Sequence, residues 1–101
     1  MNERLFQFEW DQAKADGNLR KHGLSFELAS TVFFDPSLLT VADLKHGEPE
    51  ELWFSIGIAG NGLVISLVYL WFETDPAAIK IRLISARRAT PAERRQYQEG
   101  L

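Results

Sequence analysis

Residues 52–71, LWFSIGIAGNGLVISLVYLW, contain two nearly apolar runs on either side of Gly60-Asn61-Gly62. Glycine and asparagine tolerate the positive φ angles of tight turns, so this tripeptide predicts a β-hairpin between two strands. The second run, from Leu63 to Trp71, is apolar on both faces except at Ser66. This pattern favours a central strand covered on both sides, or a strand with one face against a partner.

Further strands are expected on both sides of this hairpin, from Leu38 to Val41 and from Ile79 to Ser85, the latter beyond a turn at Asp75-Pro76. Strict alternation in the last strand predicts two faces. One face would carry Ile79, Ile81, Leu83 and Ser85, and the other Lys80, Arg82 and Ile84.

Helix signals are found at both ends of the chain. Phe6 to Trp10 alternates like a short strand, and Asp11 then serves as the N-cap of a helix that is expected to run to about His22 and stop at Gly23. A second helix is predicted from Ser25 to just before Asp35-Pro36, which completes a short helical hairpin. A last helix is predicted at the C-terminus, where Thr90, Pro91 and Glu93 form a capping box with proline at the first position.

These elements predict a single α+β domain over residues 1–101. It consists of an N-terminal helical hairpin on a twisted, largely antiparallel sheet of four to five strands, with a short C-terminal helix. The sequence contains no cysteine, and its longest apolar run is about half of the roughly 20 residues that a membrane helix needs. No signal-peptide core follows the first residues, so we expect a soluble, cytoplasmic protein without a membrane contact.

The net charge of −3 conceals an uneven distribution along the chain. Residues 35–75 hold one base and seven acids, a net charge of −6, whereas residues 76–101 hold six bases and two acids, a net charge of +4. A polyanion responds to the local field more than to the total charge, so the C-terminal quarter is compatible with nucleic-acid binding.

Candidate anion-binding residues lie at three places: Lys21-His22 at the end of the first helix, Arg82 on the last strand, and Arg87-Arg88 after it. Each has a structural alternative. Arg82 could pair with one of the seven acids of the middle segment, Arg87 and Arg88 could be a solvated pair, and His22 could simply stabilise a helix C-terminus. No metal-ligand motif accompanies His22 or His46, so we expect neither a metal nor another cofactor.

Aromatic residues raise a similar choice between structure and function. Phe26, Phe33, Trp53 and Trp71 form an apolar stripe that favours a core or an interface over a platform for stacking bases.

Several segments, in this order, resemble the BrnT family of toxins over about residues 6 to 99. They are Phe8-Glu9-Trp10-Asp11, residues 18–23 (NLRKHG) with Ser25-Phe26-Glu27, Phe34-Asp35-Pro36, residues 81–89 (IRLISARRA) and residues 93–97 (ERRQY).

The resemblance implies a RelE-like toxin of a type II toxin–antitoxin pair, a ribonuclease that blocks translation. Its partner would be a BrnA-like antitoxin, a ribbon-helix-helix DNA-binding protein that covers the toxin. The family's motif positions correspond here to Lys21, His22, Arg82, Arg87, Arg88, Glu93 and Tyr97.

From these residues we expect a metal-free ribonuclease in which Arg82 and Arg87 hold a phosphate while the ribose 2′-hydroxyl attacks. His22 or Lys21 is the expected proton-transfer group. The remaining cations, Arg88, Arg94 and Arg95, are expected to bind the RNA substrate.

Two departures from the family pattern favour a second hypothesis. The family's Glu-Arg-Trp is Glu51-Leu52-Trp53 here, and its Glu-Arg-Gly turn is replaced by the longer, apolar Leu70-Trp71-Phe72 and the residues that follow. Either loss could leave a non-catalytic or decayed toxin that still binds its antitoxin. In both cases we expect Trp71 or Phe72 at an interface, with an antitoxin or with a second copy in a homodimer.

Overall fold

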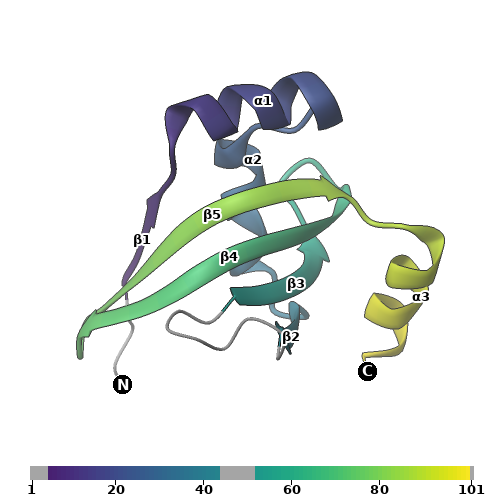
Figure 1. The fold of residues 1–101 in the computed structure, drawn as a ribbon. Coiled ribbons are helices and arrows are strands. Elements are labelled where there is room, and N and C mark those ends of the chain that lie inside the picture. The colour runs from purple at the N-terminus through teal and green to yellow at the C-terminus, as the bar shows by residue number, and fades with distance from the viewer. Residues whose placement is uncertain (1–4, 44–51, 101) are drawn as a thin grey trace.

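The computed structural model describes residues 5–43 and 52–100. Five strands form one sheet in the order β1-β5-β4-β3-β2 (Figure 1). They are β1 (Leu5–Glu9), β2 (Leu39–Asp43), β3 (Leu52–Ile58), β4 (Val64–Asp75) and β5 (Ala78–Arg88). The α+β class is therefore correct, but the sheet is mixed: β1 runs parallel to β5, and the other neighbouring strands pair antiparallel. The direction of β1 was not predictable locally, because helices follow it instead of a strand to which it could pair.

The predicted caps are confirmed at both ends of the chain. Asp11 accepts a hydrogen bond from the Lys14 backbone N–H at 3.0 Å and begins α1 (Gln12–His22), which ends at Gly23 in the left-handed conformation with φ of 70°. At the other end, Thr90 and Glu93 form the complete capping box of α3 (Pro91–Glu99).

The expected second helix is divided into two short pieces. Ser25 caps α2 (Phe26–Ser30), and the chain then tightens into a 3₁₀ turn, η1 (Thr31–Phe34). The residues predicted to share its apolar face, Phe26, Ala29, Val32 and Phe33, are all buried. The two helices do not form a simple hairpin, because α1 runs across the top of the molecule while α2 descends behind the sheet (Figure 1).

A β-bulge in β5 changes the predicted faces of this strand. Tyr69 pairs with Leu83 and Val68 pairs with Ser85, so Ile84 is an extra residue in β5. Ser85 therefore lies on the face opposite to Leu83, contrary to the strict alternation expected from sequence. The same shift brings Arg82 and Arg87, five residues apart, onto one face of the sheet.

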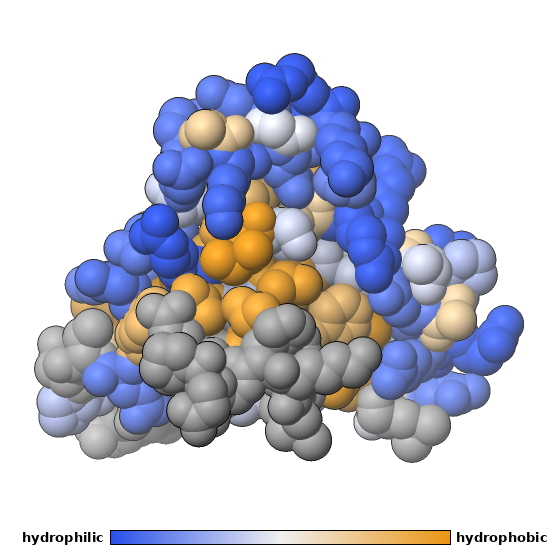
Figure 2. Space-filling model, in the orientation of Figure 1, coloured by the Kyte–Doolittle hydropathy of each residue, from blue (hydrophilic) through white to orange (hydrophobic). Residues whose placement is uncertain are grey.

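The two faces of the sheet have different covers. On one face, α1, α2 and η1 enclose the main core, in which Phe26, Val32, Ile65, Leu67 and Ile81 are fully buried. On the opposite face, which we call the open face, α3 is the only helix among the described residues, and it lies at one end, where Glu93 bonds to Ser66. Figure 2 shows hydrophobic residues gathered in the middle of the molecule beneath the hydrophilic surface of α1.

Candidate functional site

The junction between β5 and α3 is built around one carboxylate. Glu93 accepts two parallel hydrogen bonds from Arg87, Nη1 to Oε1 at 2.7 Å and Nη2 to Oε2 at 2.9 Å. Its Oε1 also accepts from the Ser66 hydroxyl at 2.8 Å and from the Thr90 backbone N–H at 2.9 Å. This bidentate geometry fixes the plane of the guanidinium and joins β4, β5 and α3 at one point.

These contacts determine the charge of both groups. The Arg87 hydrogen bonds, more than offsetting burial and supported by Thr90 and Ser66, lower the pKa of Glu93 from 4.5 to about 2. The Glu93 carboxylate in turn raises the pKa of Arg87, against a smaller opposing effect of burial. Both groups are therefore charged at neutral pH. Arg87 Nη1 also donates to the Arg88 carbonyl at 3.4 Å, and the Arg87 side chain is 41% exposed.

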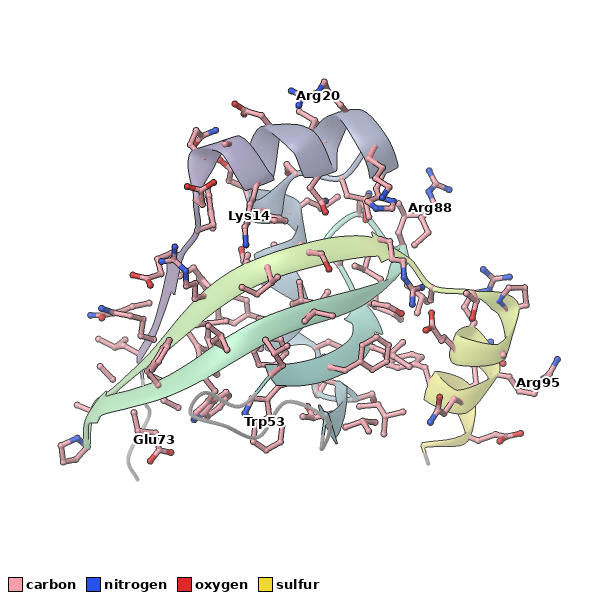
Figure 3. All side chains as sticks on the ribbon, in the orientation of Figure 1. Lys14, Arg20, Trp53, Glu73, Arg88 and Arg95 are labelled. Atoms are coloured by element: carbon pink, nitrogen blue, oxygen red, sulfur yellow. The ribbon has the colours of Figure 1, made fainter. Side chains whose placement is uncertain are left out.

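A buried asparagine places the end of α1 against the same region. The side chain of Asn18 accepts from the Ala86 backbone N–H at 3.0 Å and donates to the Leu24 carbonyl at 3.0 Å. The last turn of α1, with Lys21 and His22, therefore lies near the end of β5. Figure 3 shows Arg88 at the end of β5, next to the last turn of α1 in this view.

Arg82 lies farther along the open face and has an acidic partner. Its Nη1 donates to Glu9 Oε2 at 2.9 Å, and Lys80 lies 3.8 Å from the other oxygen of Glu9. The ion pair foreseen for Arg82 is thus present, but its partner is on β1 and not in the acidic middle segment. The β4 residues opposite Arg82 and Arg87 are Leu70 and Ser66, four residues apart, so the two arginines are separated by about 13 Å along the strands.

The strand register places Leu52, the position at which the resemblance implies an arginine, two strands away from Arg82. Leu70 pairs with Arg82 on one side and with Leu52 on the other, so these residues form one row across the open face. An arginine at position 52 would add a second cation to this row. Leucine makes the row apolar beyond Arg82.

The cations of α3 differ from one another. Arg94 Nη1 donates to the Ala89 carbonyl at 3.2 Å, and the exposed Arg95 points away from the sheet in Figure 3. Within residues 5–43 and 52–100, no carboxylate forms an ion pair with Lys21, Arg88 or Arg95.

Tyr97 attaches the second turn of α3 to the segment before β2. Its hydroxyl donates to Asp35 Oδ2 at 2.6 Å, and the same carboxylate accepts from the backbone N–H groups of Ile58 and Ser37. Burial and the Asp35 carboxylate raise the pKa of Tyr97 to about 12. The hydrogen bonds to Asp35 outweigh its burial and lower the pKa of this carboxyl.

The predicted interface residues Trp71 and Phe72 lie on opposite faces of the sheet. Trp71 is on the helical face and packs edge-on against Phe6, with ring centroids 6.3 Å apart. Phe72 is on the open face opposite Lys80. Both are half-buried, so neither is enclosed in the core.

Three polar residues that organise the site were given no functional role from sequence: Ser66, Asn18 and Asp35. Asn18 and Asp35 lie in segments that carry the family resemblance. Ser66 had a signal, since it is the only polar residue of its apolar run. Asn18 and Asp35 act across 68 and 62 residues, respectively, and only the folded chain reveals these contacts.

The described part of the chain holds neither a metal-ligand cluster nor a membrane-spanning helix. No group of three His, Cys, Asp or Glu side chains is placed to hold a metal ion. No helix there has the length and apolar character needed to cross a membrane.

Comparisons with known proteins agree on one family. Residues 10–93 match the model of a family described as the ribonuclease toxin BrnT of type II toxin–antitoxin systems. Among solved structures, the ribonuclease toxin BrnT of Brucella abortus is similar, with a TM-score of 0.63 and 19% sequence identity over 85% of this chain and 99% of its own. At this identity the likeness concerns the fold. No functionally curated protein matches the sequence.

Proposed function

The chain belongs to the BrnT family of ribonuclease toxins of type II toxin–antitoxin systems, and from this premise we propose that it is a metal-independent RNA endonuclease that stops translation in the cytoplasm. The RelE-like character of the fold is part of this proposal.

One observation supports this activity most directly. The end of α1, the end of β5 and the start of α3 meet where Asn18 bonds to Ala86 and Glu93 to Arg87. The meeting of these three elements supports a site formed by Lys21 and His22 at the end of α1, Arg87 and Arg88 at the end of β5, and Arg94 in α3. Fixed cations of this kind attract the RNA backbone and stabilise charge that develops on a phosphate during cleavage.

The proposed reaction uses the ribose 2′-hydroxyl as nucleophile. The bond between O2′ and phosphorus forms, the bond between phosphorus and O5′ breaks, and the products are a 2′,3′-cyclic phosphate and a 5′-hydroxyl. His22 accepts the proton of the 2′-hydroxyl as the general base, the role that histidine most often takes in such reactions. Lys21 supplies a proton to O5′, and Arg87 neutralises the phosphate oxygens.

The other cations bind the rest of the RNA. Arg82 is about 13 Å from Arg87 along the strands, which favours contact with a separate phosphate of the same strand. Arg88, Arg94 and Arg95 extend the cationic edge toward α3 and would contact further phosphates.

Cleavage of a short RNA by the purified chain in EDTA tests this proposal. His22→Ala and Arg82→Ala should each reduce the cleavage rate at least tenfold, with little change in melting temperature. Lys21→Ala has a matched control in Lys14→Ala, which removes the same charge from the same helix far from Arg88 (Figure 3). Loss of all cleavage in EDTA would refute metal independence, and equal losses in the two lysine variants would refute the placement of the site.

The type II family implies an antitoxin partner for this chain. We expect a BrnA-like ribbon-helix-helix protein that brings carboxylates to Arg87 and Arg88 and blocks access of RNA. Expression of the chain alone, with growth and bulk RNA followed, should stop translation, and coexpression of the neighbouring reading frame should restore growth.

A second candidate function, a decayed toxin that only binds its antitoxin, is favoured by a separate observation. Arg82 and Arg87 both already have a carboxylate partner, and the row beyond Arg82 contains Leu70 and Leu52 where the family has an arginine. This candidate predicts no cleavage and no growth arrest, together with tight binding of the antitoxin. Leu52→Arg would then restore cleavage.

A further inference from the structure

Ser66 interrupts the apolar run from Leu63 to Trp71, although it is buried, with 2% of its surface exposed. In the sheet it lies between Ile56 on β3 and Arg87 on β5. Its hydroxyl donates to Glu93 Oε1 at 2.8 Å. A buried hydroxyl costs free energy unless it is paired, and an alanine at this position would carry no such cost. The contact with Glu93 is therefore what serine provides here and alanine would not.

This hydroxyl gives the Glu93 carboxylate a direction. Without it, the carboxylate would still accept two hydrogen bonds from Arg87 and one from the Thr90 backbone N–H. The last torsion of a glutamate side chain has a broad distribution, so those contacts alone leave the plane of the carboxylate some freedom. Ser66 approaches from β4 and Thr90 from the start of α3, and together they fix this plane relative to both elements.

The contacts of Arg87 occupy one side of its guanidinium and leave one edge open. Nη1 donates to Glu93 Oε1 and, at the longer distance of 3.4 Å, to the Arg88 carbonyl, while Nη2 donates to Glu93 Oε2. In an arginine, the Nε–H lies on the same edge as the outer hydrogen of Nη2. Among the described residues, no acceptor bonds to Nε, and the Arg87 side chain is 41% exposed.

The open edge of Arg87 matches a phosphate group. It presents two parallel N–H donors, the geometry in which arginine binds two oxygens of one phosphate. The bidentate contact with Glu93 fixes the plane of the guanidinium, so the direction of the open edge follows the direction of the carboxylate. Donors that are held in place before binding lose less conformational entropy when the ligand arrives.

We propose that Ser66 is a positioning residue of the ribonuclease, which fixes the Glu93 carboxylate so that Arg87 presents its Nε and Nη2 edge to a phosphate of the RNA. The proposal rests on the proposed ribonuclease function and adds a residue that does not itself contact RNA. The charge of Glu93 supports it. The Arg87 hydrogen bonds lower the pKa of this carboxyl to about 2, so at neutral pH it stays ionised and holds the guanidinium.

Binding of a 2′-O-methyl RNA oligonucleotide, measured by fluorescence anisotropy, tests the proposal. The methyl group blocks the attacking 2′-oxygen, so binding is measured without cleavage. Ser66→Ala removes one hydroxyl and no charge, and it should weaken binding about fivefold, because the open edge of Arg87 is no longer held in place. Cleavage of the unmodified RNA should slow by at least the same factor.

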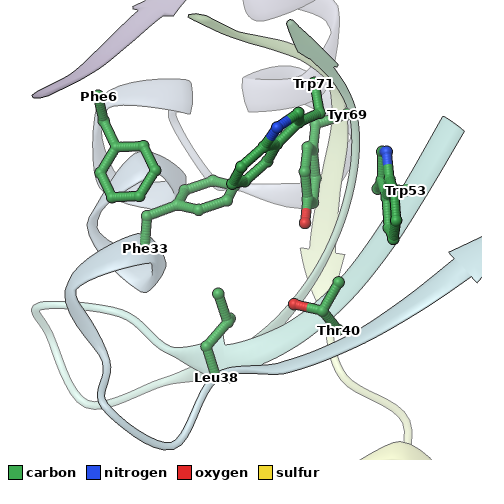
Figure 4. Close-up of a pocket in the computed structure, with 7 residues that line it drawn as sticks. All are labelled: Phe6, Phe33, Leu38, Thr40, Trp53, Tyr69 and Trp71. Carbon is green, nitrogen blue, oxygen red and sulfur yellow. The ribbon is translucent and has the colours of Figure 1, made fainter. Parts of the chain in front are cut away.

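Ser55→Ala is the matched control. Ser55 is buried on the neighbouring strand β3, and its hydroxyl bonds to Tyr69 and Thr40, which line an apolar pocket on the helical face (Figure 4). This variant should lower the melting temperature by an amount comparable to that in Ser66→Ala, because each loses one buried hydroxyl. It should change binding of the oligonucleotide by less than about twofold.

Two further measurements separate positioning from a structural role. The amide of Glu93→Gln cannot accept both bonds from Arg87, so in that variant Ser66 has no guanidinium to direct. Adding Ser66→Ala to Glu93→Gln should therefore weaken binding by less than about twofold. In the wild type, the oligonucleotide should shift the Nε–H NMR signal of Arg87, and this shift should be smaller in Ser66→Ala.

The positioning role and the ribonuclease activity fail separately in this design. Unchanged binding in Ser66→Ala, an equal loss in Ser55→Ala, or a full further loss in the Glu93→Gln background would overturn the positioning role, even if the wild type cleaves RNA. Binding that depends on Ser66 in a wild-type chain that does not cleave would refute the activity and retain Ser66 as the residue that positions Arg87. A wild-type chain that neither binds nor cleaves would refute both.

Discussion

At the Val64 end of the β4–β5 pair, side chains meet through charged hydrogen bonds, whereas around Trp71 they meet through aromatic rings. The first region holds α3, a helix with no buried residue, by the Arg87–Glu93 pair and the Tyr97–Asp35 bond. The second region encloses Phe33, which is 9% exposed and contacts the rings of three other aromatic residues.

The difference indicates how each region responds to change. Charged hydrogen bonds depend on protonation and on direction, so the α3 junction should be sensitive to pH and to isosteric substitution. Aromatic packing depends on buried volume, so the region around Trp71 should be sensitive to truncation and insensitive to pH. The candidate residues Arg87 and Arg88 thus lie in the region whose stability should vary with pH, whereas Arg82 lies toward the aromatic region.

Truncation of Phe33 should give the largest effect. Phe33→Ala removes a buried ring and should lower the free energy of unfolding by about 3–4 kcal/mol. Phe34→Ala is the matched control, since this neighbouring ring is 70% exposed and should cost about 1 kcal/mol or less. Urea unfolding at two pH values measures both. If the two variants lost the same free energy of unfolding, or if the loss in Phe33→Ala depended strongly on pH, the expected contrast between the aromatic region and the α3 junction would be wrong.

Loss of the Glu93 charge should have a smaller effect that depends on pH. Glu93→Gln should lower the free energy of unfolding at pH 7 by about 1–2 kcal/mol, because charge-assisted bonds to Arg87 are replaced by neutral ones. Glu99→Gln removes the same charge from the same helix and should change stability by less than about 0.5 kcal/mol.

The sign of the pH dependence follows from the lowered pKa of Glu93. Its folded value of about 2 is below the ordinary 4.5, so its contribution is complete above pH 4.5 and is lost as the pH falls toward 2. The stability difference between wild type and Glu93→Gln should therefore shrink over this interval in urea unfolding. If this stability difference stays constant from pH 7 to pH 3, the charge of the Glu93 carboxylate is not what stabilises the wild type.

Local features of the molecule could be predicted from the sequence. Asp11, Ser25 and the Thr90–Glu93 capping box all act within three residues, so their patterns were sufficient. The Gly60-Asn61-Gly62 turn is equally local, and Gly62 adopts a φ of 88°.

Features that depend on distant residues could not be predicted. The bulge at Ile84 has no glycine to mark it, yet it decides that Arg82 and Arg87 share a face. The sequence predicted an acidic partner for Arg82 but did not identify Glu9. Glu9 is 73 residues away, and its strand had no predicted neighbour. The convergence of α1 with β5 likewise depends on Asn18, whose bond to Ala86 has no local pattern.

The smallest expected effect is at the second attachment of α3. Tyr97→Phe removes one hydroxyl from Asp35, which keeps the backbone N–H groups of Ile58 and Ser37, so the free energy of unfolding should fall by about 1 kcal/mol or less. The folded pKa of Tyr97, about 12, is above the ordinary 10, so the bond contributes fully below pH 10 and is lost as the pH rises toward 12. A double-mutant cycle with Asp35→Asn should give a coupling energy at pH 7 that disappears at alkaline pH, where the phenol of Tyr97 ionises. No coupling at pH 7 would show that the Arg87–Glu93 pair alone holds α3. The α3 junction would then depend on one charged contact, and its contrast with the aromatic region would be smaller than we expect.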